Sequence, residues 1–135
     1  MPKYIVAKEF YFDAAHQLPG EEIYGKCSKL HGHTYKLIVK VQGEVNAKDK
    51  MVINFDIIKN IVRKEVIDKF DHKFLNDYFL FPTAEIIADY IYDIISYKIK
   101  MLNEVGKDKR DGLTLHSIIL YETPTSFVEI INEQA

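Results

Sequence analysis

Two long stretches of alternating apolar and polar residues constrain this chain more than any other feature. Residues 3–15 and residues 31–44 place apolar side chains at nearly every second position. Side chains on a β-strand point alternately to its two faces, so each stretch predicts a long strand with one buried face. Pro19, Gly20 and Gly25 interrupt the segment between them, which predicts a loop over residues 17–30.

Helical spacing replaces the alternation in the middle of the chain. Apolar residues recur every three or four positions over 57–70 and again over 86–101, which predicts two helices. Asn54 or Asp56 can cap the first helix, and Thr83 the second. Residues 113–121 and 126–132 predict two closing strands. The order β-β-α-α-β-β predicts an α+β fold with an antiparallel sheet and helices on one face.

Length and composition narrow the class of protein. The 135 residues fit one domain covering 1–135, and a net charge of −2 gives no basic field for nucleic acid. The single cysteine, Cys27, excludes an intrachain disulfide and favours a reducing compartment. No run of about 18 apolar residues is present to span a membrane, and Met1-Pro2-Lys3 leads directly into a strand. We therefore expect a cytoplasmic protein without a signal peptide.

The strongest local motif is His31-Gly32-His33. If these residues enter a strand, the two imidazoles share a face and can bind one metal ion. His16, at the end of the first strand, supplies a third imidazole if the two strands are antiparallel neighbours. Three histidines with an open fourth position form the usual catalytic zinc site, and the cysteines of a closed structural site are missing. The alternative is a chance pattern without metal.

Cys27 precedes His31 by four residues and lies between Lys26 and Ser28. Positive charge nearby favours the thiolate, so this position suits a reactive cysteine. Two alternatives stay open at this point. The thiol can be buried and inert, as a lone cysteine commonly is, or it can itself bind the metal.

Three carboxylates have positions that suit chemistry. Asp71 directly precedes His72, and a carboxylate beside an imidazole orients it and stabilises its charged form for proton transfer. Glu122 ends a predicted strand, where it can accept two N–H bonds from an amidine-like ring edge. Each has a simpler alternative: Asp71 and His72 as surface residues at a helix end, and Glu122 as a solvated turn residue. Glu85 in the first helical turn is explained by the helix dipole alone.

Five motifs in order resemble the family of 6-pyruvoyl-tetrahydropterin synthases and 6-carboxy-tetrahydropterin synthases. They cover nearly the whole chain and comprise Phe12-Asp13-Ala14-Ala15-His16, the segment from Cys27 to Tyr35, Asp71-His72-Lys73-Phe74-Leu75-Asn76, Pro82-Thr83-Ala84-Glu85 and Glu122-Thr123-Pro124-Thr125-Ser126. The spacing of three residues between Cys27 and His31, and the Glu-Thr-Pro-Thr-Ser motif, are similar to the 6-carboxy branch.

This resemblance implies the tunnelling fold, with a four-stranded antiparallel sheet and two helices. It also implies homo-hexamers built as dimers of trimers, with active sites between subunits. By resemblance, the residues that correspond to the Zn²⁺ ligands are His16, His31 and His33. Cys27 corresponds to the catalytic base and Asp71-His72 to its partner pair. Glu122 corresponds to the pterin anchor, and Glu85 to a second pterin contact.

The function that the resemblance implies is a zinc-dependent lyase reaction. The substrate would be 7,8-dihydroneopterin triphosphate, converted to 6-carboxytetrahydropterin with release of acetaldehyde and triphosphate, on the path to queuosine or archaeosine. The nearest alternative is a 6-pyruvoyl-tetrahydropterin synthase acting on the same substrate. A non-catalytic zinc or pterin-binding protein and a zinc hydrolase are the alternatives from other classes.

Overall fold

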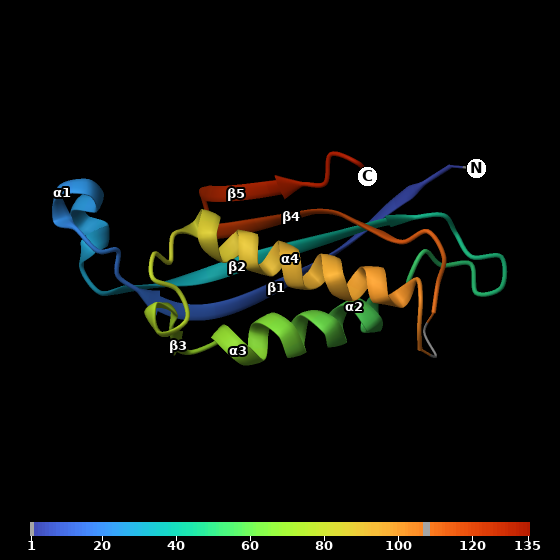
Figure 1. Cartoon of the computed structure of the whole chain (residues 1–135), viewed down its shortest axis with the longest axis horizontal. Helices are drawn as coiled ribbons and strands as arrows, with labels where there is room; N and C mark the ends of the chain where they lie inside the picture. Colours follow the sequence, from blue (N-terminus) through green and yellow to red (C-terminus); the bar gives the residue numbers. More distant parts are fainter. Residues whose placement is uncertain (1, 107–108) are drawn as a thin grey trace.

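The computed structural model describes residues 2–106 and 109–135 and contains a single curved sheet with helices along one face (Figure 1). The two long strands predicted from alternation are β1, Tyr4–His16, and β2, His31–Gly43. The closing strands are β4, Thr114–Thr123, and β5, Ser126–Ile131. All these strands pair antiparallel, which confirms the predicted antiparallel sheet.

The sheet has five strands in the order β3-β1-β2-β4-β5, one more than the four expected. The additional strand β3, Lys73–Phe74, pairs parallel with Ala14 and Ala15 of β1. Two residues are too few to show an alternating pattern, so this edge strand could not be predicted from the sequence. Its position is set instead by a contact distant in sequence, because the N–H of His72 donates to the carbonyl of Asp13 at 2.6 Å.

The segment between the long strands also differs from the predicted loop. It contains a short helix α1, Glu21–Tyr24, followed by a 3-10 turn η1, Gly25–Ser28. Both elements are about one turn long, which is below the length at which helical periodicity becomes visible. Together they form the end of the molecule at which β1 finishes and β2 begins (Figure 1).

The helices begin at the predicted caps. Asn54 accepts from the N–H of Asp56 at 2.8 Å and starts α2, Phe55–Val62. A π-helical turn η2, Arg63–Ile67, and a last turn α3, Asp68–Phe70, continue it. After a 3-10 turn η3, Leu75–Asp77, Thr83 accepts from the N–H of Ile86 at 3.2 Å. This cap starts the long helix α4, Ala84–Leu102.

The core lies between the helices and one face of the sheet. On β1 the even-numbered residues from Phe10 to His16 are buried, and on β2 the odd-numbered residues from Tyr35 to Gly43 are buried. The helices contribute Ile58, Val62, Val66, Phe70, Ile87, Ile91, Ile95 and Ile99. This alternation gives the sheet a face towards the helices and an outer face, and it decides on which face each site residue lies.

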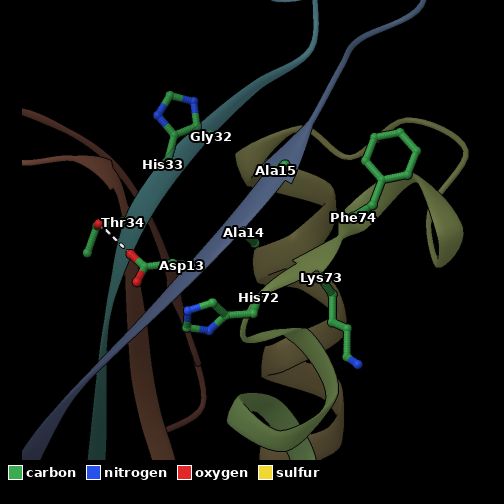
Figure 2. A pocket seen from close by; sticks show the side chains of 9 residues that line it. All are labelled: Asp13, Ala14, Ala15, Gly32, His33, Thr34, His72, Lys73 and Phe74. Carbon is green, nitrogen blue, oxygen red and sulfur yellow. Dashed lines mark hydrogen bonds between the residues drawn. The ribbon is translucent and has the colours of Figure 1, made fainter.

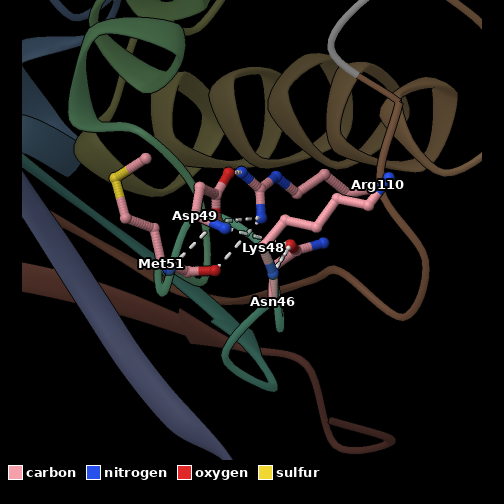
Figure 3. A network of polar contacts seen from close by, with 5 residues as sticks. All are labelled: Asn46, Lys48, Asp49, Met51 and Arg110. Carbon is pink, nitrogen blue, oxygen red and sulfur yellow. Dashed lines mark hydrogen bonds and ion pairs between the residues drawn. The ribbon is translucent and has the colours of Figure 1, made fainter.

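An ion pair closes the end of the molecule opposite α1 (Figure 3). The guanidinium of Arg110, whose side chain is 12% exposed, pairs with Asp49 and donates to the carbonyl of Met51 at 3.1 Å. Hydrogen bonding from Arg110 lowers the pKa of Asp49 below its ordinary value. The contact ties the turn after β2 to the segment that leads into β4.

Candidate metal centre and active site

The strand register brings the three predicted histidines together. His16 lies directly opposite His31, and Ala14 lies opposite His33, so all three imidazoles project from the helix-facing side at the end of the sheet. Their ring nitrogens lie within 4.8 Å of one another, and the Nε2 atoms of His16 and His31 are 2.9 Å apart. The rings meet at steep angles, which aims nitrogens from three directions at one point.

Backbone carbonyls fix the orientation of two of these rings. Nδ1 of His16 donates to the carbonyl of Pro82 at 2.8 Å, and Nδ1 of His31 donates to the carbonyl of Lys29 at 2.6 Å. A carbonyl can only accept, so in a neutral ring the proton is on Nδ1 and Nε2 carries a lone pair. Two facing lone pairs repel unless a proton or a cation lies between them. This arrangement is typical of histidines that bind a metal.

His33 completes the set with a buried Nε2 that has no hydrogen-bond partner among the described residues. Burial is the main cause that lowers the pKa of His33, and the neighbouring His16 and His31 lower it further, while the carboxylate of Glu122 opposes them. The lowered pKa favours the neutral imidazole, the form that can bind a metal. The three side chains together fit a metal ion that prefers nitrogen ligands, such as zinc.

Glu122 lies beside this cluster, with Oε1 at 3.7 Å from Nε2 of His33. The pairing of β2 with β4 ends at Lys36 and Tyr121, so Glu122 projects where the two strands part. It borders a cavity of about 640 Å³ that also includes His33. On its other side it borders a cavity of about 380 Å³ that also includes Glu85 and Thr83. The two acids predicted to contact substrate thus share one cavity, and Glu122 also lies beside His33.

Tyr35 is a site residue that the sequence analysis did not single out. Its ring lies 5.6 Å from that of His33 and stacks on Phe12 at 5.0 Å, and its buried hydroxyl has no hydrogen-bond partner among the described residues. Burial, and secondarily the charge of Glu122, raises the pKa of Tyr35 well above its ordinary value. The available signal was its position two residues after His33, on the same face of the strand.

Cys27 lies in the turn η1 and is exposed. Its carbonyl accepts from the N–H of Leu18 at 2.8 Å, which holds the turn beside the end of β1, two residues beyond His16. The group of candidate metal ligands formed by the three histidines, whose ligand atoms lie within 4.8 Å of one another, does not include the Cys27 sulfur. The thiol is thus exposed and not buried.

Asp71 and His72 form the expected pair, but on the other side of the sheet. Oδ2 of Asp71 lies 3.0 Å from Nδ1 of His72, and its Oδ1 accepts from the N–H of Asp13 at 2.9 Å. That N–H and His72 lower the pKa of Asp71. The His72 side chain is 77% exposed, borders a cavity of about 570 Å³, and turns towards Asp13 on the outer face (Figure 2). It does not join the three-histidine group.

Comparison with known proteins identifies the family. A family model described as 6-pyruvoyl tetrahydropterin synthase matches residues 5–133. The chain belongs to this family. The resemblance inferred from the five motifs is therefore confirmed, and the members of the family are pterin synthase enzymes.

Relatives named 6-carboxy-5,6,7,8-tetrahydropterin synthase occur in several bacteria. The protein from Haemophilus influenzae is 39% identical, with 92% of this chain and 96% of the relative covered. The protein from Synechocystis is 36% identical, with 91% and 89% covered. A relative from Pongo abelii named 6-pyruvoyl tetrahydrobiopterin synthase is 30% identical, with 91% and 88% covered. The synthases of both branches are thus homologues, and those of the 6-carboxy branch reach the higher identity among these three.

A solved structure supports the expected fold. The 6-pyruvoyl tetrahydropterin synthase of Caenorhabditis elegans superimposes with a TM-score of 0.80 at 25% identity, and 98% of each chain is covered. This similarity confirms the tunnelling fold inferred from the resemblance, although the sheet has a fifth strand and the segment between β1 and β2 contains the helix α1. Among the described residues, no helix is long and apolar enough to cross a membrane.

Proposed function

We propose that the protein is a 6-carboxy-5,6,7,8-tetrahydropterin synthase. It converts 7,8-dihydroneopterin triphosphate to 6-carboxytetrahydropterin, acetaldehyde and triphosphate in the cytoplasm, as a step towards queuosine or archaeosine. The observation that carries this proposal is the convergence of three oriented imidazoles beside Glu122, which also shares a cavity with Glu85. The relatives named 6-carboxy synthases support the choice of branch.

The three histidines would hold Zn²⁺, which supplies Lewis acidity towards the hydroxyl groups of the substrate. Glu122 accepts N–H bonds from the pterin ring and fixes its register, and Glu85 contacts the same ring from the far side of the shared cavity. Cys27, as thiolate, removes a proton from the side chain of the substrate. His72, oriented by Asp71 through Nδ1, exchanges a proton through Nε2.

The position of the pair on the outer face bears on how the site is assembled. Asp71 and His72 lie beside Asp13 on the outer face, whereas the three histidines project towards the helices. A neighbouring copy of the chain can bring its own pair to the metal-binding side without refolding either one. We therefore propose that the active site forms between subunits, in a homo-hexamer built as a dimer of trimers.

The decisive experiment is mass spectrometry of the products after zinc-loaded protein is incubated with 7,8-dihydroneopterin triphosphate, together with an acetaldehyde assay. We expect 6-carboxytetrahydropterin and one acetaldehyde for each triphosphate released. The Cys27→Ala variant is the matched control and should give neither product.

Two other results would change the assignment. A pyruvoyl product without acetaldehyde would place the chain in the 6-pyruvoyl branch, a candidate that the relative from Pongo abelii favours. Substrate binding without turnover would indicate a non-catalytic pterin-binding protein. Ester or amide hydrolysis that persists in Cys27→Ala would indicate a zinc hydrolase.

A further inference from the structure

Asp13 has no role in the proposed mechanism, yet its backbone N–H and its carbonyl both contact the proton-transfer pair. It lies on the outer face of β1, opposite Thr34 of β2. The hydroxyl of Thr34 donates to Oδ1 of Asp13 at 2.5 Å, which fixes the carboxylate (Figure 2). The side chain of Asp13 is thus held by a neighbouring strand and is not free to rotate in solvent.

The backbone of Asp13 holds the pair from both sides. Its N–H donates to Oδ1 of Asp71 at 2.9 Å, and its carbonyl accepts from the N–H of His72 at 2.6 Å. His72 has a left-handed backbone with φ of 62°, a conformation that is unfavourable in a residue with a side chain. The contact with Asp13, and the β3 pairing that follows it, hold this backbone in place.

The charges around His72 are mostly negative. Polar atoms of Asp13, Asp71 and His72 all lie within 4.8 Å of one another. The cavity that His72 borders also includes Thr34 and His33 from β2, and Lys73 from its own segment. Asp71 occupies Nδ1 of the ring, and Figure 2 shows the ring turned towards the Asp13 carboxylate.

We propose that Asp13, held by Thr34, is a positioning residue for His72. Its carboxylate supplies a second negative charge beside the imidazole and restricts the rotation of the ring. A histidine that exchanges protons becomes positively charged in one part of the cycle, and a fixed carboxylate stabilises that form where it is needed. This inference depends on the proposed function, in which His72 transfers a proton.

The test uses the full-length, zinc-loaded protein and its steady-state kinetics. Asp13→Asn removes the charge but can still accept from Thr34, so the fold and the zinc content should not change. We expect kcat to fall about tenfold with KM unchanged, a small part of the 10² to 10⁴ that a general acid–base group contributes. Thr34→Val should give a smaller loss of kcat, and Thr34→Ser, which restores the hydroxyl, should recover it.

A double-mutant cycle separates positioning from a structural effect. In a His72→Gln background, Asp13→Asn should have little further effect on the residual kcat, because the group it positions is gone. An unchanged kcat in Asp13→Asn, or an equal loss in both backgrounds, would overturn the inference. If the wild-type protein gives no turnover, the proposed function fails. The ring ¹⁵N signals of His72 then test the contact alone: they should change in Asp13→Asn and Thr34→Val, and no change would overturn it.

Discussion

Replacing Tyr35 by phenylalanine tests the description of the metal site most directly. The substitution removes one oxygen atom and keeps the ring, which has no exposed surface and stacks on Phe12 at an interplanar angle of 9°. The hydroxyl is buried and has no hydrogen-bond partner among the described residues. A buried polar group without a partner costs about 1–3 kcal/mol, so its removal should stabilise the protein.

We expect Tyr35→Phe to raise the free energy of unfolding by about 1 kcal/mol, or the melting temperature by about 4 °C for a chain of this size. The measurement is urea denaturation of the chelator-treated protein at pH 7, followed by circular dichroism. Tyr35→Leu is the matched control, because it also removes the hydroxyl but loses the ring. It should lower the free energy of unfolding by about 2 kcal/mol.

Tyr35→Phe should also change the stability of the protein at alkaline pH. The raised pKa of Tyr35 means that the unfolded phenol ionises at about pH 10 while the folded phenol stays neutral. The wild-type protein should therefore lose stability as the pH rises above about 10, and Tyr35→Phe should lose less. A variant that is less stable than wild type by 1 kcal/mol or more at pH 7 would refute the reasoning, since it would mean that the hydroxyl has a partner.

Three further predictions concern the metal ligands, the thiol and a helix cap. The lowered pKa of His33 means that the metal-free protein should lose stability as the pH falls below about 6.5. His33→Asn should lose less stability over the same pH range, as measured by denaturation at several pH values. Cys27→Ala should abolish turnover but keep its full zinc content, measured by elemental analysis, whereas His31→Ala should lose zinc. Loss of zinc in Cys27→Ala would contradict the assignment of Cys27 as a base. Asn54→Ala should lower the free energy of unfolding by about 1 kcal/mol without affecting zinc, because it removes the cap of α2.

Long periodic patterns made most of the fold predictable. Alternation over 13 residues located β1 and β2 to within a residue or so, because a slip of one position would turn every apolar side chain to the wrong face. The caps Asn54 and Thr83 were predictable from the sequence because capping depends on local chemistry. The strand β3 was not predictable, since it depends on a hydrogen bond between His72 and Asp13, which are far apart in sequence.

The identities of the site residues were easier to predict than their positions in the structure. Period two places His31 and His33 on one face, but only the strand register shows that His16 lies opposite His31. The simpler interpretation of Glu122, a solvated turn residue, is wrong, because β4 continues past its pairing with β2 and brings the carboxylate to His33. The location of His72 on the outer face depends on its left-handed backbone. This conformation could not be predicted, because the residue is not a glycine.

The separation of Cys27, in the turn η1, from His72, on the outer face beside Asp13, has a genetic consequence. When each active site combines the thiol of one subunit with the imidazole of another, two inactive variants can repair each other. Co-expressed Cys27→Ala and His72→Ala chains that assemble at random would contain both intact groups at about a quarter of their interfaces. Cells carrying the two defective alleles together would then make product, although neither allele alone could support synthesis.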